Sequence, residues 1–220
     1  MADKVIDFGA SEGFGEFTGW ESQSTTDNTT NQRSVALNDK GDEAASDLHD
    51  EKQEVTSRYQ CQSNTNTIPS AIGALVNALI LSGINIVTGE GKAAEMTLTG
   101  HNHTNNAHAA EPALRTSDHG ITVAKCFGAT DFLSGTAGEN ASCIEGSVNI
   151  TCEHADQNDG DGDHLVGENY NAKIEANSKW SGVPSANDDA AHDVTAETDE
   201  DTNTGFQTTA VVGVKTLTMS

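Results

Sequence analysis

The sequence has little positive charge. It contains 11 Lys+Arg against 34 Asp+Glu, which gives a formal net charge of −23 at pH 7. Such a surface repels nucleic-acid phosphates and most membranes. The acidity extends from Asp3 to Asp201, through segments that otherwise resemble strands, whereas the apolar segment 68–87 requires a core. We therefore expect a folded domain with a strongly negative surface.

Long apolar runs are also missing. The best candidate, 71–87, is interrupted by Gly73, Asn77, Gly83 and Asn85, and a membrane-spanning helix needs about 20 apolar residues. We therefore expect no membrane-spanning segment. The first residues, MADKVIDFGASEG, lack a basic region followed by an apolar stretch. We accordingly expect no secretory signal and assembly in a cytoplasm.

Aromatic residues and catalytic motifs are scarce. Only 5% of the residues are aromatic, too few for the aromatic-lined clefts of glycosidases. No phosphate-binding G-x-x-x-x-G-K-[ST] loop occurs, and no Ser or Cys has the surroundings of an activated nucleophile. We therefore expect that the protein is not an enzyme and uses no cofactor.

The four cysteines are far apart and form no CxxC pair, which excludes zinc-ribbon and thioredoxin spacings. We expect them to be small buried residues, and a disulfide between two of them is the alternative. The cysteines are Cys61, Cys126, Cys143 and Cys152.

Alternation of apolar and polar residues predicts a mainly β chain that forms a single domain over 1–220. An extended N-terminal arm covers 1–13, and acidic loops are expected at 39–50, 155–164 and 184–205. The strands are expected at 14–23, 31–38, 51–62, 84–88, 93–101, 120–126, 141–154, 165–177 and 206–219. The segments 31–38 and 51–62 are expected to pair as an antiparallel hairpin.

One short helix is expected at 69–79. Pro69 suits the first turn of a helix. Ile72, Leu75, Val76 and Leu79 then follow at helical spacing. Because 35% hydrophobic residues give a thin core for this length, we also expect subunits to bury surface against one another.

The segment 101–108 contains the most metal-like pattern. His101 and His103 are two residues apart, so they share one face of a strand, and His108 could complete the set, with Glu111 nearby. The alternative is a group of solvated histidines at the start of a polar loop. We favour this alternative and predict no metal site here.

The Asp/Gly run at 156–163 resembles a calcium loop. The EF-hand register fails, however, because a frame from Asp159 places His164 at the glycine position and Tyr170 at the terminal glutamate position. A solvated hairpin turn is therefore the preferred interpretation. The weaker alternative is a nonstandard calcium site built from Asp159, Asp161 and Asp163.

The order of elements resembles that of the tail tube proteins of tailed bacteriophages and of related ring-forming proteins in phage-derived injection systems. The resemblance covers roughly residues 30–182. It is carried by the strands around the acidic turn 39–47, the segment 69–79, the strands to His103, and the later hairpin 142–182 with its Asp/Gly turn.

This resemblance implies a β-sandwich or small β-barrel with a short flanking helix and a long inter-subunit hairpin, for which 39–50 is the candidate. It implies a virion tail protein that stacks as hexameric rings and contacts sheath, terminator and baseplate proteins. DNA would pass through its acidic channel without specific binding. The alternatives are another tail or baseplate ring component, a secreted acidic β-domain that binds calcium, and an enzyme of a salt-loving organism.

Overall fold

The chain consists of antiparallel strands in the part that the computed structural model describes, which is residues 13–103, 114–133, 141–162, 164–182, 193–200 and 207–220. The strands are β1 (Trp20–Leu37), β2 (Glu43–Cys61), β3 (Ala71–Ile72), β4 (Leu75–Val76), β5 (Leu79–Gly89), β6 (Glu95–His103), β7 (Ser117–Asp118), β8 (Ser142–Asn158), β9 (His164–Ser181), β10 (Asp193–Glu200) and β11 (Thr208–Thr216). The prediction of a mainly β protein is thus confirmed.

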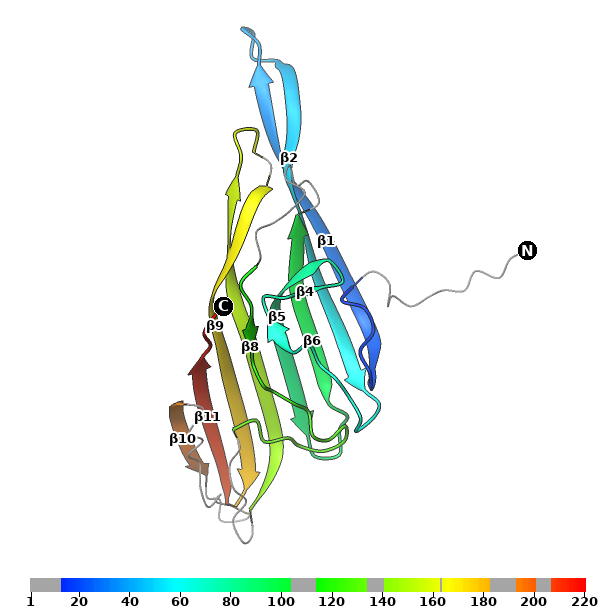
Figure 1. Ribbon diagram of the computed structural model, residues 1–220, viewed down its shortest axis with the longest axis vertical. Coiled ribbons are helices and arrows are strands. Elements are labelled where there is room, and N and C mark those ends of the chain that lie inside the picture. Colours follow the sequence, from blue (N-terminus) through cyan, green and yellow to red (C-terminus); the bar gives the residue numbers. More distant parts are fainter. Residues whose placement is uncertain (1–12, 104–113, 134–140, 163, 183–192, 201–206) are drawn as a thin grey trace, which may run out of the picture.

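Nine of the described strands form one large sheet in the order β1-β2-β6-β5-β8-β9-β11-β10, with β4 added beside β5 (Figure 1). Strands β1 and β10 are the two edges and do not pair with each other, so the sheet is open. Of the expected β-sandwich or small β-barrel, the closed barrel is therefore not formed. Strands β3 and β7 make a separate two-stranded sheet.

The predicted helix at 69–79 is wrong. This segment contains the short strands β3 and β4, and Val76 pairs with Leu79 across a two-residue turn. Both turn residues are left-handed, with φ of 50° at Asn77 and 65° at Ala78, as type I′ hairpins require. Consecutive left-handed residues cannot continue an α-helix.

The core lies where segments outside the large sheet pack against its strands. Ile84, Met96 and Ile150 from neighbouring strands are fully buried, and the same cluster includes Phe14, which precedes β1, and Leu133, which lies between β7 and β8.

The predicted strand at 120–126 is wrong. The segment lies outside the described strands, and its Val123 and Cys126 are buried in the core cluster. Its apolar alternation therefore reflects burial beneath the sheet, without strand pairing.

The long hairpins are more extended than the sequence suggests. An antiparallel hairpin of β1 with β2 is present, but the predicted pairing of 31–38 with 51–62 is wrong: 32–37 pairs with 43–49, and 52–61 pairs with 20–30. Strand β2 already begins at Glu43, so most of the expected loop 39–50 is strand. Similarly, β10 lies within the expected acidic loop 184–205. Residues 1–12 of the expected N-terminal arm lie outside the described residues.

All four cysteines are described and none forms a disulfide. Cys61, Cys126 and Cys152 are buried and Cys143 is half-buried, which agrees with their expected role as small buried residues. The described residues also include no helix of the length and apolarity that crossing a membrane requires.

Candidate metal centre

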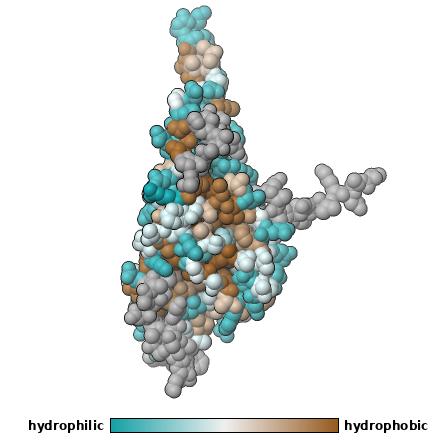
Figure 2. Space-filling view, viewed as in Figure 1, coloured by the Kyte–Doolittle hydropathy of each residue, from teal (hydrophilic) through white to brown (hydrophobic). Residues whose placement is uncertain are grey.

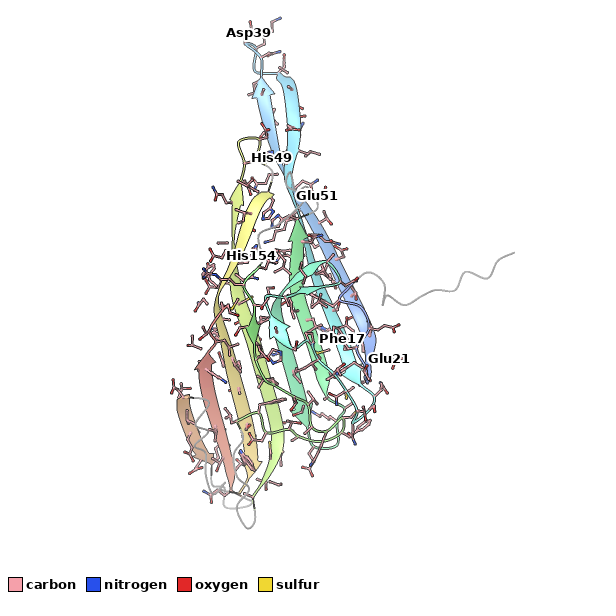
Figure 3. The ribbon with its side chains drawn as sticks, viewed as in Figure 1. Phe17, Glu21, Asp39, His49, Glu51 and His154 are labelled. Atoms are coloured by element: carbon pink, nitrogen blue, oxygen red, sulfur yellow. The ribbon has the colours of Figure 1, made fainter. Side chains whose placement is uncertain are left out.

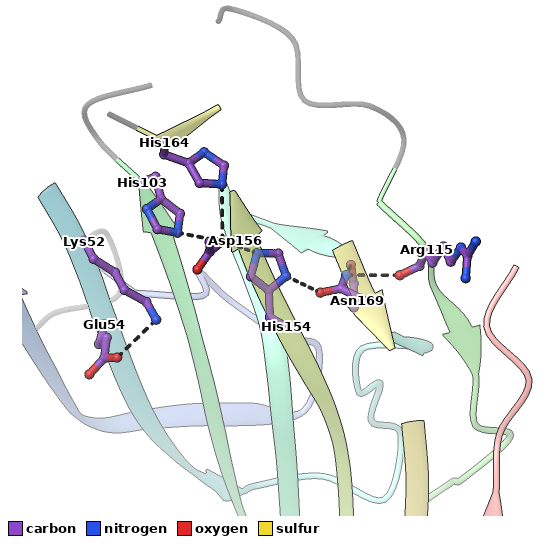
Figure 4. A network of polar contacts seen from close by, with 9 residues as sticks. Lys52, Glu54, His103, Arg115, His154, Asp156, His164 and Asn169 are labelled. Atoms are coloured by element: carbon purple, nitrogen blue, oxygen red, sulfur yellow. Dashed lines mark hydrogen bonds and ion pairs between the residues drawn. The ribbon is translucent and has the colours of Figure 1, made fainter. Parts of the chain in front are cut away.

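A group of histidines lies where the sheet loses its central strand. At the start of β5, the outermost pair with β6 is Ile80 with His101, and the outermost pair with β8 is Gly83 with Thr151. Beyond these pairs, β6 continues to His103 and β8 continues to Asn158. Polar side chains from the two strands meet there, as Figure 4 shows. We call His101, His103, His154, Asp156 and His164 the histidine cluster.

The carboxylate of Asp156 is the centre of the histidine cluster. Its Oδ1 atom lies 2.7 Å from Nε2 of His154 and 3.2 Å from Nε2 of both His103 and His164. Three strands, β6, β8 and β9, therefore supply nitrogen atoms to one oxygen atom (Figure 4).

The imidazole rings also contact one another. The rings of His103 and His164 are stacked, with centroids 3.9 Å apart and an angle of 9° between their planes. The ring of His101 lies edge-on to that of His154 at 4.5 Å. The four rings thus form one continuous group around Asp156.

The histidine cluster is shielded from water. His164 is 0% exposed, and His101 and His103 are each 6% exposed, whereas the Asp156 side chain retains 26% exposure. Nε2 of His101 is buried and has no hydrogen-bond partner among the described residues. A buried polar atom without a partner is costly, so this nitrogen is suited to an additional ligand.

Burial, followed by the nearby His154 and Lys52, lowers the pKa of His101 to about 3. The ring is therefore neutral at physiological pH and presents a lone pair. Burial alone would raise the pKa of Asp156, but the interactions of its carboxylate with His103 and His154 outweigh burial and hold that pKa well below its usual range. The cluster therefore combines a neutral imidazole with a carboxylate.

Asn169 of β9 fixes the ring of His154 from behind. Its Nδ2 atom donates to the backbone oxygens of Gly73, at 2.9 Å, and Arg115, at 3.1 Å. Its Oδ1 atom lies 2.7 Å from Nδ1 of His154, so it accepts the Nδ1 proton. In a neutral His154 ring, Nε2 then presents a lone pair to Asp156.

Gly167 provides the space that the His154 ring needs. A Cβ atom added at position 167 would lie 2.3 Å from Nε2 and 2.5 Å from Cε1 of His154. The glycine therefore allows β9 to approach the imidazole closely.

The structure brings together two of the residues that the sequence suggested, His101 and His103. The other two suggested partners, His108 and Glu111, lie outside the described residues. Sequence reasoning missed His154, Asp156 and His164. A usable signal was present, because His154 and Asp156 repeat the two-residue spacing of His101 and His103.

The calcium candidates do not belong to the histidine cluster. Asp159 and Asp161 lie in the turn between β8 and β9, where Oδ1 of Asp159 accepts the backbone N–H of Asp161 at 2.9 Å. The remaining candidate, Asp163, lies outside the described residues.

Imidazole nitrogens with one carboxylate suit zinc and other first-row transition ions, whereas calcium and magnesium prefer oxygen atoms.

Comparison of the sequence with protein-family models and with curated proteins finds no match. The chemistry of the protein is therefore argued from its own residues.

Proposed function

We propose that this protein is a structural subunit of a virion, a tail tube protein whose copies assemble into stacked hexameric rings. The supporting observation is a long hairpin that the chain builds but does not bury. Strand β2 pairs with β6 from Lys52 to Gln60. The part of β2 that precedes Lys52 pairs with β1 alone, so the two strands form a two-stranded ribbon there. We call residues 31–49 the arm; Asp39 marks its tip in Figure 3.

The described part of the chain provides no core for the arm. Every residue from 26 to 48 is exposed. A two-stranded hairpin alone is at best marginally stable in water. A ribbon of this length therefore benefits from a second surface, which a neighbouring subunit would supply.

One face of the arm carries an apolar stripe. Val35, Leu37 and Leu48 are 43%, 64% and 58% exposed. The pairing of Arg33 with Leu48 and of Val35 with Ser46 places all three apolar side chains on the same face of the ribbon. Figure 2 shows apolar atoms on the arm below its hydrophilic tip. This stripe is the surface that we assign to the contact between subunits.

The charge supports a conduit that does not retain DNA. With a net charge of −23, a ring of such subunits would present carboxylates to passing phosphates, and the two repel each other. The edge strand β10 is also acidic and fully exposed, which discourages unwanted pairing between sheet edges. A baseplate or other tail ring would use the same features.

The first test is negative-stain electron microscopy of the full chain, with mass measured by light scattering, at low and moderate salt. Screening weakens repulsion between acidic subunits, so salt should promote assembly. We expect six-membered rings or tubes with a central channel. A monomer at every salt and protein concentration would contradict the proposal.

The role of the arm is tested with the triple variant Val35→Ser, Leu37→Ser and Leu48→Ser. The matched control is Leu75→Ser, Val87→Ser and Val194→Ser, which removes comparably exposed apolar side chains outside the arm. We expect the control to assemble and the arm variant to remain monomeric. Normal assembly of the arm variant would exclude the arm as the contact.

A further inference from the structure

We propose that the histidine cluster binds one divalent first-row transition-metal ion per chain, with zinc as the reference ion, through His101, His103, His154 and Asp156. The ion would hold β6 against β8 in the region beyond the end of β5. This inference concerns a site within one subunit and is independent of the proposed assembly function.

The first argument is the spacing of the ligand atoms. One ligand atom from each of the four residues lies within 4.8 Å of all the others. Tetrahedral zinc with bonds of about 2.0–2.1 Å separates its ligand atoms by about 3.3 Å. Nε2 of His103 is already 3.2 Å from Oδ1 of Asp156, and Nε2 of His154 is 2.7 Å from it. Small side-chain shifts would therefore complete a tetrahedral site.

The second argument is the proton held by Asn169. Because Nδ1 of His154 donates to Asn169, its Nε2 atom can face the carboxylate of Asp156 favourably only when a cation stands between them. That cation is either a second proton on the ring or a metal ion. The arrangement of a metal-binding histidine oriented by a hydrogen bond from its other nitrogen is general in metal sites.

The third argument is Nε2 of His101. It is buried, has no hydrogen-bond partner among the described residues, and belongs to a side chain that is only 6% exposed. A metal ion would use its lone pair. His164, stacked on His103 and 3.2 Å from the carboxylate, acts as a positioning residue for both.

The burial of the three imidazole donors favours a structural role for the ion. Structural zinc sites are closed by four protein ligands, whereas catalytic sites keep a position for water. Here the four ligands come from two strands that no longer share a partner strand. A bound ion would replace that missing connection and fix the distal half of the β8–β9 hairpin.

The test uses the full chain, stripped with a chelator and dialysed against zinc chloride, with the retained metal measured by mass spectrometry. We expect about one ion per chain and an increase in melting temperature on loading. Cobalt should give the intense visible absorption of four-coordinate sites. Failure of the wild-type chain to retain zinc would overturn the proposal.

The variants His101→Gln and Asp156→Asn should each reduce zinc affinity at least tenfold and abolish the cobalt spectrum. His49→Gln is the matched control, because His49 lies beside the β8–β9 turn at Gly162 and outside the histidine cluster. Asp156→Asn is nearly isosteric and partly exposed, so it keeps the test valid if the buried His101 variant does not fold. Equal zinc retention by Asp156→Asn and the wild type would also overturn the assignment.

Discussion

The two long hairpins of this protein extend from the same end of the sheet but differ in how they are held (Figure 1). The distal half of β8–β9 is tied to the rest of the chain through His154, Asp156, His164 and Asn169. The arm of β1–β2 has its own ladder of strand pairs, and its residues from 31 to 48 are all exposed.

Among the described residues, neither distal half contains an apolar core, so the difference is due to polar contacts. The β8–β9 hairpin is completed inside the chain by buried imidazole, amide and carboxylate groups, whose positions are narrowly defined. The arm keeps its apolar stripe facing outward, which makes it available to another subunit. One hairpin therefore serves the subunit and the other serves the proposed assembly.

The largest difference is expected in hydrogen exchange of the dilute, unassembled protein. Amides at 31–37 and 43–48 open with a free energy near zero, because a lone hairpin is marginal. Amides at 166–174 are protected by buried contacts, so we expect them to exchange at least about 1,000-fold more slowly. Exchange measured by mass spectrometry checks this. Similar amide protection in both hairpins would show that the arm and the β8–β9 hairpin are held equally well within the chain.

The next largest effect is expected for Asn169→Ala. This side chain is fully buried and joins His154 to two backbone carbonyls. Its removal leaves buried polar groups unpaired, which should lower the free energy of unfolding by about 3 kcal/mol. Denaturant titration measures the loss. The control Asn177→Ala, on the same strand with one weak 3.5 Å contact, should cost less than about 1 kcal/mol.

If Asn169→Ala proved as mild as Asn177→Ala, the network would not be what holds the β8–β9 hairpin. The measurement is made on chelator-treated protein, so that loss of a bound ion does not contribute to the difference.

Much of the fold could be predicted from the sequence where alternation was strict. The strand at 51–62 was predicted from Val55, Tyr59 and Cys61 on one face, but these residues pair with 20–27 and not with the predicted partner 31–38. The helix at 69–79 failed because four apolar residues over eight positions suit either a helix or short strands. Only the left-handed Asn77 and Ala78 decide between them. The acidic composition of 43–50 wrongly predicted a loop, because cross-strand pairing with β1 makes this segment a strand.

The histidine cluster was only half visible in the sequence. His101 and His103 stood out because they are neighbours on one strand, but their partners come from residues about 50 positions later. They meet at the N-terminal end of β5, and the sequence predicted that this strand begins later than it does. It expected a strand only from Ile84, whereas β5 begins at Leu79. Three-dimensional register, which local patterns do not determine, completes the site.

A pair of glycine variants compares the two hairpins directly. In Gly167→Ala the new methyl group meets the His154 ring at 2.3 Å, and we expect a loss of about 2 kcal/mol from overpacking. In Gly41→Ala nothing lies within 4 Å and only the φ of +84° is unfavourable, which costs about 1 kcal/mol. Thermal unfolding measures both. A larger loss for Gly41→Ala would indicate that the arm tip is packed.

The smallest effect is expected for the triple variant of the arm stripe, Val35→Ser, Leu37→Ser and Leu48→Ser. These side chains are already largely exposed, so their removal should change the free energy of unfolding of the monomer by no more than about 0.5 kcal/mol. Denaturant titration at a protein concentration below assembly isolates this quantity. Combined with a loss of rings, an unchanged stability would show that the stripe acts between chains. A loss above about 1.5 kcal/mol would mean that the stripe packs within its own chain, so that both hairpins would be held internally and the arm would have no surface left for a neighbour.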